Sequence, residues 1–232
     1  MSKKKKKKVS SQQFFPATIR VLLSAIPAIG SPLAQAYSEW ENIKNTQRLD
    51  EFFDYFTKEL NKNKMQINPQ KLKEEDWHTF EKILQYVQVE HSQKKKERFA
   101  NILLNSWDIN NSNSYDIKIA FIKAVDDFSD LHIRVLQILN ANVDKWIDYK
   151  DLKKQSFIKS DIEMISILFD LATRYGFIVR QNNSPAIMIH TYPEGMAMVC
   201  QQKITMKGME FLKYINEDYI AYDNLNENII SS

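Results

Sequence analysis

Apolar residues recur every three or four positions across much of residues 37–128, the spacing that gathers them on one face of an α-helix. The pattern begins in residues 40–60 and returns in residues 77–87, 99–107 and 117–128. Loops of polar residues interrupt it. The sequence therefore predicts a domain of about four helices.

The first of these segments has an aromatic face. A stripe of large apolar side chains at helical spacing is usually a packing surface, so we expect it to form a core rather than to bind a cofactor. Within one chain it would pack on Trp77, Phe80 and Leu84 of the next segment, and between chains it would build a homo-oligomer. The stripe consists of Trp40, Ile43, Leu49, Phe52, Phe53, Phe56 and Leu60.

Residues 129–216 begin with short helical segments. Ser129 is a suitable N-cap for the first of them, because its side chain can accept a hydrogen bond from the first turn. A second helix is expected over residues 149–155, and a third over residues 162–175, where Gly176 ends it. Three short helices are therefore expected before any strand.

Extended structure is expected after these helices. Residues 177–179 open it, and a hairpin that turns at Pro193–Gly195 follows. Residues 204–208 would end the last strand, and a helix over residues 209–215 would close the segment. This order predicts a mainly α fold, with a helical N-terminal region followed by a winged-helix-like α+β module at residues 129–216.

Charge is unevenly distributed along the chain. The net charge is only +3, yet Lys3–Lys8 form an unbroken basic run and residues 217–232 form an acidic tail. Residues 21–38 contain no charged side chain, but two prolines and a glycine interrupt them. Because these residues weaken backbone hydrogen bonds that lipid cannot replace, an interfacial or buried hairpin fits better than a membrane-spanning helix.

Residues 1–36 thus combine a basic run with an apolar segment, and together these would anchor the chain on an anionic membrane. The alternative is a solvated tail followed by a core helix. Deletion of residues 1–36 should abolish membrane association under the first interpretation. The residues that would contact the membrane are Lys3, Lys4, Lys5, Lys6, Lys7, Lys8, Val21, Leu22, Leu23, Ile26 and Ile29.

Residues with catalytic or metal-binding chemistry are sparse. The four histidines lie far apart in sequence, and Cys200, the single cysteine, is expected to pack within a strand. The four glycines form no phosphate-binding loop. We therefore expect no catalytic residues, no metal and no cofactor, and a protein that is not an enzyme. A lone cysteine fits a reducing compartment, so the predicted location is the cytoplasm, peripheral to the inner face of the plasma membrane if the N-terminus binds lipid.

The predicted third helix is poorly suited to DNA. It offers Asp161, Glu163 and Asp170 against Arg174, a balance that repels phosphate. A DNA-binding regulator stays open as an alternative, because cations cluster around the second and third helices. Its phosphate contacts would be Lys150, Lys153, Lys154, Lys159 and Arg174.

Several short motifs between Lys94 and Ile215 are informative together. They are Arg98-Phe-Ala-Asn-Ile-Leu-Leu-Asn105, Phe121-Ile122, Phe128-Ser129-Asp130-Leu131, Val135-Leu136, and Thr205 with Gly208. In these motifs the chain resembles the Abi-alpha (abortive infection alpha) family of bacterial proteins. Members of that family have a similar sequence motif at the end of a helix, a helix that leads into a turn with leucine, serine and an acidic residue, and a C-terminal helix with a threonine-x-x-glycine motif. Met206-Lys207 departs from the proline-leucine pair often seen inside that last motif.

The resemblance implies a bacterial or prophage-encoded protein of phage defence, and it carries over no catalytic residues. We therefore expect a non-enzymatic effector or adaptor. Its expected partner is another protein or a second copy of the chain, with an anionic membrane surface as a further partner and nucleic acid less favoured.

Overall fold

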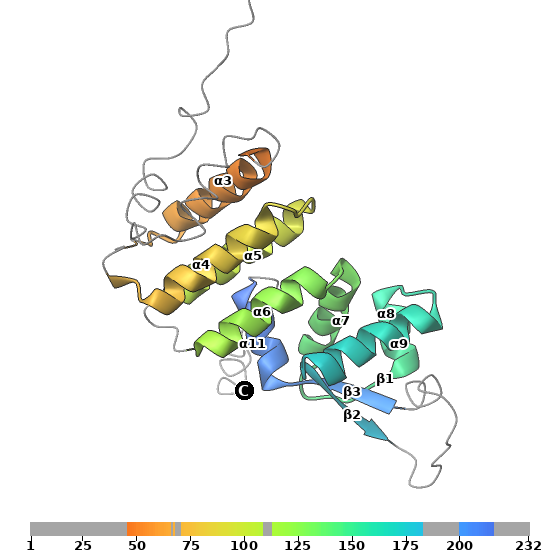
Figure 1. Ribbon diagram of the computed structural model, residues 1–232. Helices are drawn as coiled ribbons and strands as arrows, with labels where there is room; N and C mark the ends of the chain where they lie inside the picture. Colours follow the sequence, from red (N-terminus) through yellow and green to blue (C-terminus); the bar gives the residue numbers. More distant parts are fainter. Residues whose placement is uncertain (1–45, 66, 68–70, 109–112, 183–199, 216–232) are drawn as a thin grey trace, which may run out of the picture. The chain divides into compact units, whose positions relative to one another are not determined.

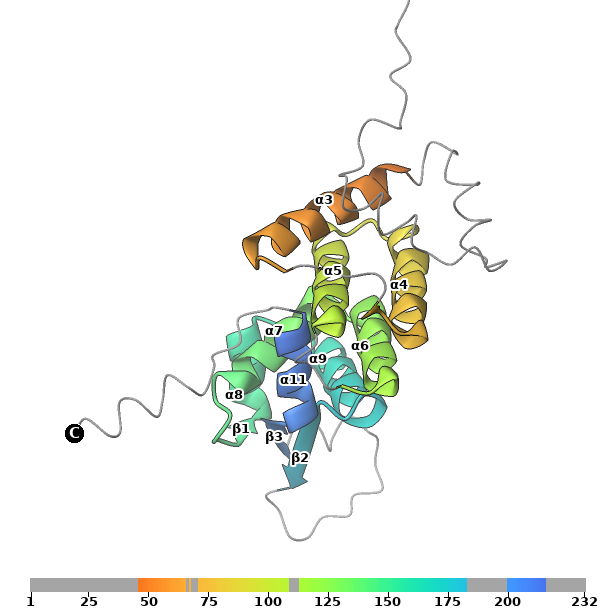
Figure 2. The same ribbon diagram turned by 90° about the vertical axis from the view of Figure 1, so that its left-hand side faces the viewer.

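The computed structural model describes residues 46–65, 67, 71–108, 113–182 and 200–215. Contacts divide the chain into two compact units, residues 1–118 and 119–232. The described residues are mainly helical, with a small three-stranded antiparallel sheet in the second unit (Figures 1 and 2). The mainly α fold class is confirmed at this level.

The N-terminal unit is helical throughout its described part. It contains α3 (Thr46–Lys62), α4 (Glu74–Val87) and α5 (Gln93–Trp107), and α6 (Tyr115–Asp127) begins in it. Helix α3 packs against both α4 and α5, and α4 packs against α5 (Figure 2). The unit boundary lies within α6, ahead of the boundary after residue 128 that the sequence suggested.

The aromatic face of α3 forms the core of this unit. Phe53 is 1% exposed, and its ring centroid lies 6.4 Å from that of Phe80 on α4. Phe56 contacts Trp107 of α5 edge to face, with the ring centroids 5.8 Å apart. The prediction that this stripe is a packing surface is confirmed from Leu49 to Leu60. Its first two members, Trp40 and Ile43, lie outside the described residues.

The C-terminal unit combines short helices with the sheet (Figure 1). Ser129 caps its first helix, as predicted, and His132 completes the cap by accepting a hydrogen bond at Nδ1 from the Ser129 backbone N–H. The elements in order are α7 (Asp130–Asn140), β1 (Ile147–Asp148), α8 (Tyr149–Ser156), α9 (Asp161–Phe169), the π-helical turn η3 (Asp170–Arg174), β2 (Ile178–Asn182), β3 (Cys200–Ile204) and α11 (Met206–Tyr214).

Strand β3 lies in the middle of the sheet, in the order β1–β3–β2, and both pairings are antiparallel. Gln202 faces Ile147 on one side and Arg180 on the other, which fixes the register across all three strands. Helix α7 packs against β3, α8 and α11. Helix α8 contacts β1 and β3 as well, so two helices pack against the sheet.

Aromatic side chains also fill the core of this unit. Phe177 stacks on Phe211 with ring centroids 4.7 Å apart, and Phe121 and Phe128 contact both rings edge to face. Because Phe121 belongs to α6, that helix contributes its apolar face to this core. The core therefore draws on a segment that precedes the predicted module.

The structure corrects the sequence prediction at two points. Residues 206–208 belong to α11 rather than to the end of a strand, because the side chain of Thr205 caps the helix there. The third helix ends in a π-helical turn, in which the Tyr175 N–H donates to the carbonyl of Asp170. The two-residue strand β1 was not predicted, and the hairpin turn at Pro193–Gly195 lies outside the described residues.

The threonine-x-x-glycine motif has a structural explanation. Oγ1 of Thr205 accepts a hydrogen bond from the Gly208 N–H at 3.1 Å and donates one to the carbonyl of Gly176 at 2.9 Å. A Cβ at position 208 would lie 2.4 Å from the carbonyl oxygen of Phe177, so only glycine fits without movement of the backbone. The motif fastens the start of α11 to the chain that enters β2.

Candidate anion-binding pocket

Four of the five cations predicted from sequence line one open pocket in the C-terminal unit. Lys150, Lys153 and Lys154 lie on α8 at the three- and four-residue spacing that places side chains on one helix face. Lys159 follows in the turn that leads to α9. The pocket has a volume of about 700 Å³, which is within the usual range of ligand sites. Its other lining residues are Tyr149, Phe157, Ile158 and Asp161.

A fixed group of three side chains forms one wall. The Tyr149 hydroxyl donates to Oδ1 of Asp161 at 2.7 Å, and Nζ of Lys153 donates to the same oxygen at 2.6 Å. The hydrogen bond from Lys153 is the main reason why the pKa of Asp161 is lowered. Burial, followed by the hydrogen bond to Asp161, raises the pKa of Tyr149, so its hydroxyl stays a donor. Lys153 and Asp161 therefore compensate each other's charge.

The other three lysines of the pocket have no carboxylate partner among the described residues, so they can pair with a ligand. Lys150, Lys154 and Lys159 are exposed, and no hydrogen bond or ion pair joins their side chains to any residue that the structure describes. Like charges gathered around a concave site focus a positive potential in it and attract anions. The pocket is thus suited to a ligand that carries several negative charges.

Phe157 lines the pocket in an uncommon backbone conformation. Its φ is 58°, in the left-handed region, and its side chain is 80% exposed. The residue ends α8, a position that glycine usually takes because a side chain there costs about 1 kcal/mol or more. A bulky apolar ring thus occupies a strained position without the gain of burial, and such strain is typical of functional sites.

The fifth predicted cation, Arg174, lies away from the pocket. Its Nη2 is 2.9 Å from Oδ2 of Asp127, and its guanidinium lies 5.6 Å from the ring centre of Tyr175. The same carboxylate accepts a hydrogen bond from the Tyr175 hydroxyl. Arg174 therefore takes part in a structural contact at the end of η3.

The lining residues other than lysine were missed from the sequence. A cation cluster is visible in the sequence because residues 150–159 contain four lysines. Nothing in the sequence distinguishes Phe157 from a core phenylalanine, and Tyr149 and Asp161 are twelve residues apart. The predicted end of the second helix at residue 155 placed Phe157 after the helix, but it did not show that the ring is exposed.

Among the described residues, the histidine and cysteine side chains that could act in catalysis include several that make structural contacts. His132 is part of the α7 cap and lies 3.5 Å from Asp170, while His78 contacts the Tyr115 hydroxyl at 3.2 Å. Burial raises the pKa of the Cys200 thiol, which keeps it a poor nucleophile. No group of three or more histidine, cysteine, aspartate or glutamate side chains that could hold a metal occurs among the described residues. The absence of an enzymatic activity stays a prediction.

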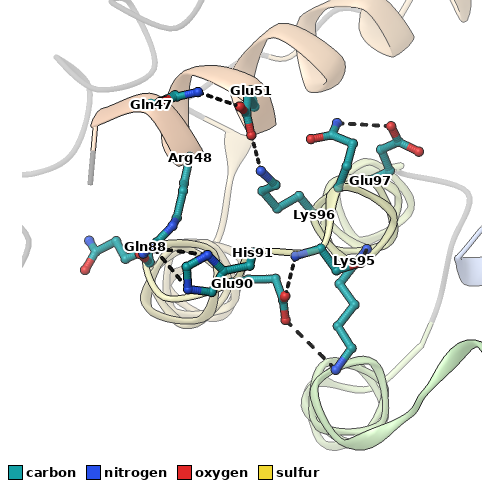
Figure 3. Close-up of polar contacts among 11 residues, drawn as sticks. Gln47, Arg48, Glu51, Gln88, Glu90, His91, Lys95, Lys96 and Glu97 are labelled. Atoms are coloured by element: carbon teal, nitrogen blue, oxygen red, sulfur yellow. Dashed lines mark hydrogen bonds and ion pairs between the residues drawn. The ribbon is translucent and has the colours of Figure 1, made fainter. Parts of the chain in front are cut away.

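In the N-terminal unit Arg48, Lys95 and Lys96 make polar contacts with neighbouring residues (Figure 3). The Lys96 ammonium of α5 is buried and pairs with Glu51 of α3, and this hydrogen bond is the main reason why the pKa of Glu51 is lowered. Arg48 donates to the carbonyl of Gln88 at 2.7 Å, which ties α3 to the end of α4. These contacts join α3 to α4 and α5.

The predicted membrane-contacting residues, from Lys3 to Ile29, all lie outside the described part of the chain. No helix among the residues that are described is both long enough and apolar enough to cross a membrane. Association of the N-terminus with a membrane therefore stays a prediction.

No protein-family model matches the chain, and neither does any curated protein or any solved structure.

Proposed function

We propose that this chain is a non-enzymatic binding protein, that residues 129–216 form a winged-helix module, and that this module binds the phosphate backbone of nucleic acid in the pocket beside α8. The single observation that carries the proposal is the convergence of Lys150, Lys154 and Lys159 around one open pocket. An effector or adaptor role in phage defence, which the resemblance to the Abi-alpha family implies, is compatible with such binding.

The topology of the C-terminal unit supports the winged-helix part of the proposal. Among the described residues the order from α7 to β3 is helix, strand, two helices, of which the second ends in η3, and two further strands, and the sheet order is β1–β3–β2. This is the order of elements and strands that a winged helix has. The pocket is lined by α8, by the turn that follows it and by Asp161 at the start of α9, which is where the helix pair of a winged helix would lie.

The charges support a phosphate ligand in particular. Lysine binds phosphate as a point charge, and each cation that neutralises a phosphate releases condensed counterions. The three uncompensated lysines of the pocket lie within ten residues of one another, on α8 and the turn that follows it. A row of phosphates can contact several of them at once, whereas a single carboxylate can contact few.

The proposal is tested by the salt dependence of binding. Fluorescence anisotropy with labelled nucleic acid would compare the parent with the pocket variant K150A/K154A/K159A and a charge-matched control, K123A/K145A/K213A. The control lysines are also exposed and lie in the same unit but outside the pocket. All three proteins should fold alike, because surface substitutions usually change stability by less than about 0.5 kcal/mol.

We expect the pocket variant to bind more weakly and its slope of log affinity against log salt to become shallower by about 2 to 3, since three phosphate contacts are lost. The control should keep the parent's slope. Equal affinities and equal slopes for the pocket variant and the control would overturn the proposal.

A further inference from the structure

The face that α9 presents is unsuited to a DNA groove. Helices that enter the major groove contact base edges through polar and cationic side chains near their N-terminal end. Helix α9 contains no lysine, arginine, asparagine or glutamine, and its first turn carries Asp161 and Glu163. Its exposed positions include Ile162, which is 73% exposed, and Phe169. Carboxylates and apolar side chains at these places would meet phosphates and water in a duplex complex.

The neighbouring pocket offers a different mode of contact. Phe157 exposes its ring beside Lys154 and Lys159, so an aromatic face and two uncompensated cations lie within six residues of the chain. Bases in a single strand are free to stack on an aromatic side chain while the adjacent phosphates contact lysines. Bases in a duplex are stacked on one another and are not free for such a contact.

The strained backbone at Phe157 adds to this argument. Glycine would relieve the strain at φ 58°, yet the chain has a large apolar side chain there that does not pack in the core. Hydrogen bonds join Tyr149 and Lys153 to Asp161, so the pocket that Phe157 lines with them is partly formed before a ligand binds. An exposed stacking platform explains why an aromatic residue occupies this position.

We propose that the pocket binds single-stranded nucleic acid in preference to duplex, with one base stacked on Phe157 and the flanking phosphates on Lys150, Lys154 and Lys159. This inference rests on the proposed function, because it uses the same lysines. Beyond the proposed function, the inference names single-stranded nucleic acid as the preferred ligand and Phe157 as the residue that causes this preference.

The test uses the full chain and three probes of equal length: a single strand, the corresponding duplex, and an abasic strand that has phosphates but no bases. Phe157→Gly removes the ring and relieves the backbone strain, so the variant keeps its fold. Phe157→Trp restores an aromatic face. Anisotropy titrations would compare both with the parent and with K150A/K154A/K159A.

We expect the parent to bind the single strand more tightly than the duplex or the abasic strand. Phe157→Gly should weaken binding of the single strand roughly 5- to 140-fold, the effect of one lost stacking contact, and should leave binding of the abasic strand unchanged. Phe157→Trp should bind the single strand as the parent does. The lysine variant should bind all three probes more weakly.

Contrary outcomes separate the two proposals. If single strand and duplex bind equally and Phe157→Gly has no effect, while the lysine variant still weakens binding, the single-strand inference is wrong and the proposed function stands. If the lysine variant binds every probe as the parent does, both are wrong. Binding of poly-glutamate without binding of any nucleic acid probe would instead assign the pocket to an acidic protein partner and overturn both.

Discussion

The two units differ in how many large apolar side chains they expose and in where they leave lysines without a carboxylate partner. Among the described residues, Val89 is the one large hydrophobic side chain that the N-terminal unit leaves exposed, whereas the C-terminal unit exposes Trp146, Phe157, Ile162, Phe169, Val179 and Met206. In the N-terminal unit two lysines are buried and paired with carboxylates, Lys96 with Glu51 and Lys118 with Asp76. The C-terminal unit gathers three lysines without such partners around a pocket.

This difference indicates that the two units have different roles, packing in one and ligand binding in the other. Burial of a phenylalanine stabilises a fold by about 1.5 to 3 kcal/mol, so a unit that leaves several large apolar side chains in water forgoes stability. Clustered exposed apolar groups beside charges mark interaction sites. The N-terminal unit therefore supplies a stable helical body, and the C-terminal unit carries the surface on which a ligand is expected.

The largest loss of stability is expected from a substitution in the aromatic core of the N-terminal unit. Phe53→Ala should lower the free energy of unfolding by about 3 to 5 kcal/mol, because it leaves a cavity among the rings of α3 and α4. Phe157→Gly is the matched control, since that ring is exposed and its loss should not destabilise the chain. Chemical denaturation of both variants would measure the contrast, and equal stability of parent and Phe53→Ala would show that the face is not packed.

A smaller loss of stability is expected when a methyl group is added at Gly208 in the C-terminal unit. Gly208→Ala would place a Cβ 2.4 Å from the Phe177 carbonyl oxygen and 2.9 Å from Cγ1 of Ile204. Because backbone must move to make room, we expect a loss of about 2 to 3 kcal/mol in a thermal or chemical melt. Gly176→Asn is the comparison variant, since that site has no atom near a new Cβ and asparagine tolerates its φ of 66°. A Gly208→Ala protein as stable as the parent would contradict the close approach of α11 to β2.

The smallest effect concerns the ion pair of the N-terminal unit. Glu51→Gln leaves the Lys96 ammonium, whose side chain is 3% exposed, without its carboxylate. We expect a loss of about 1 to 2 kcal/mol, less than for a fully buried pair because the Glu51 side chain is 40% exposed.

The sign of the pH dependence follows from the lowered pKa of Glu51. Its contribution is fully present above the ordinary carboxyl value of 4.5 and is lost as pH falls through the lower pKa of the folded state. The stability difference between parent and Glu51→Gln should therefore shrink as pH falls below the ordinary carboxyl value of 4.5 and through the lower pKa of the folded state. Denaturation curves at a series of pH values measure it, and a constant difference in acid would exclude the ion pair as its cause.

The sequence predicted local structure better than long-range packing. Helical spacing sufficed to place the aromatic face of α3 in a core, because the stripe is continuous over several turns. It did not show that α6 contributes Phe121 to the core of the following unit, since periodicity identifies an apolar face but not its partner. Strand β1 has two residues and is too short for any alternating pattern.

The sequence predicted the cluster of lysines at the site but not the geometry of the pocket. Four clustered lysines are evident in the sequence, yet the compensation of Lys153 by Asp161 depends on a turn that brings α9 back to α8. The exposure of Phe157 depends on a left-handed residue at the end of α8. Arg174 belongs to the same stretch of sequence but pairs with Asp127 of α6, a contact that sequence spacing does not reveal.

Hydrogen–deuterium exchange of the full chain with and without a single-stranded oligonucleotide tests the central claim most directly, because it follows both units in one experiment. The account predicts that bound ligand slows exchange in residues 149–161, around the pocket, and leaves α3, α4 and α5 unchanged. Slowed exchange confined to α3–α5, or to the basic run at Lys3–Lys8, with no change at residues 149–161, would contradict the assignment of binding to the C-terminal unit.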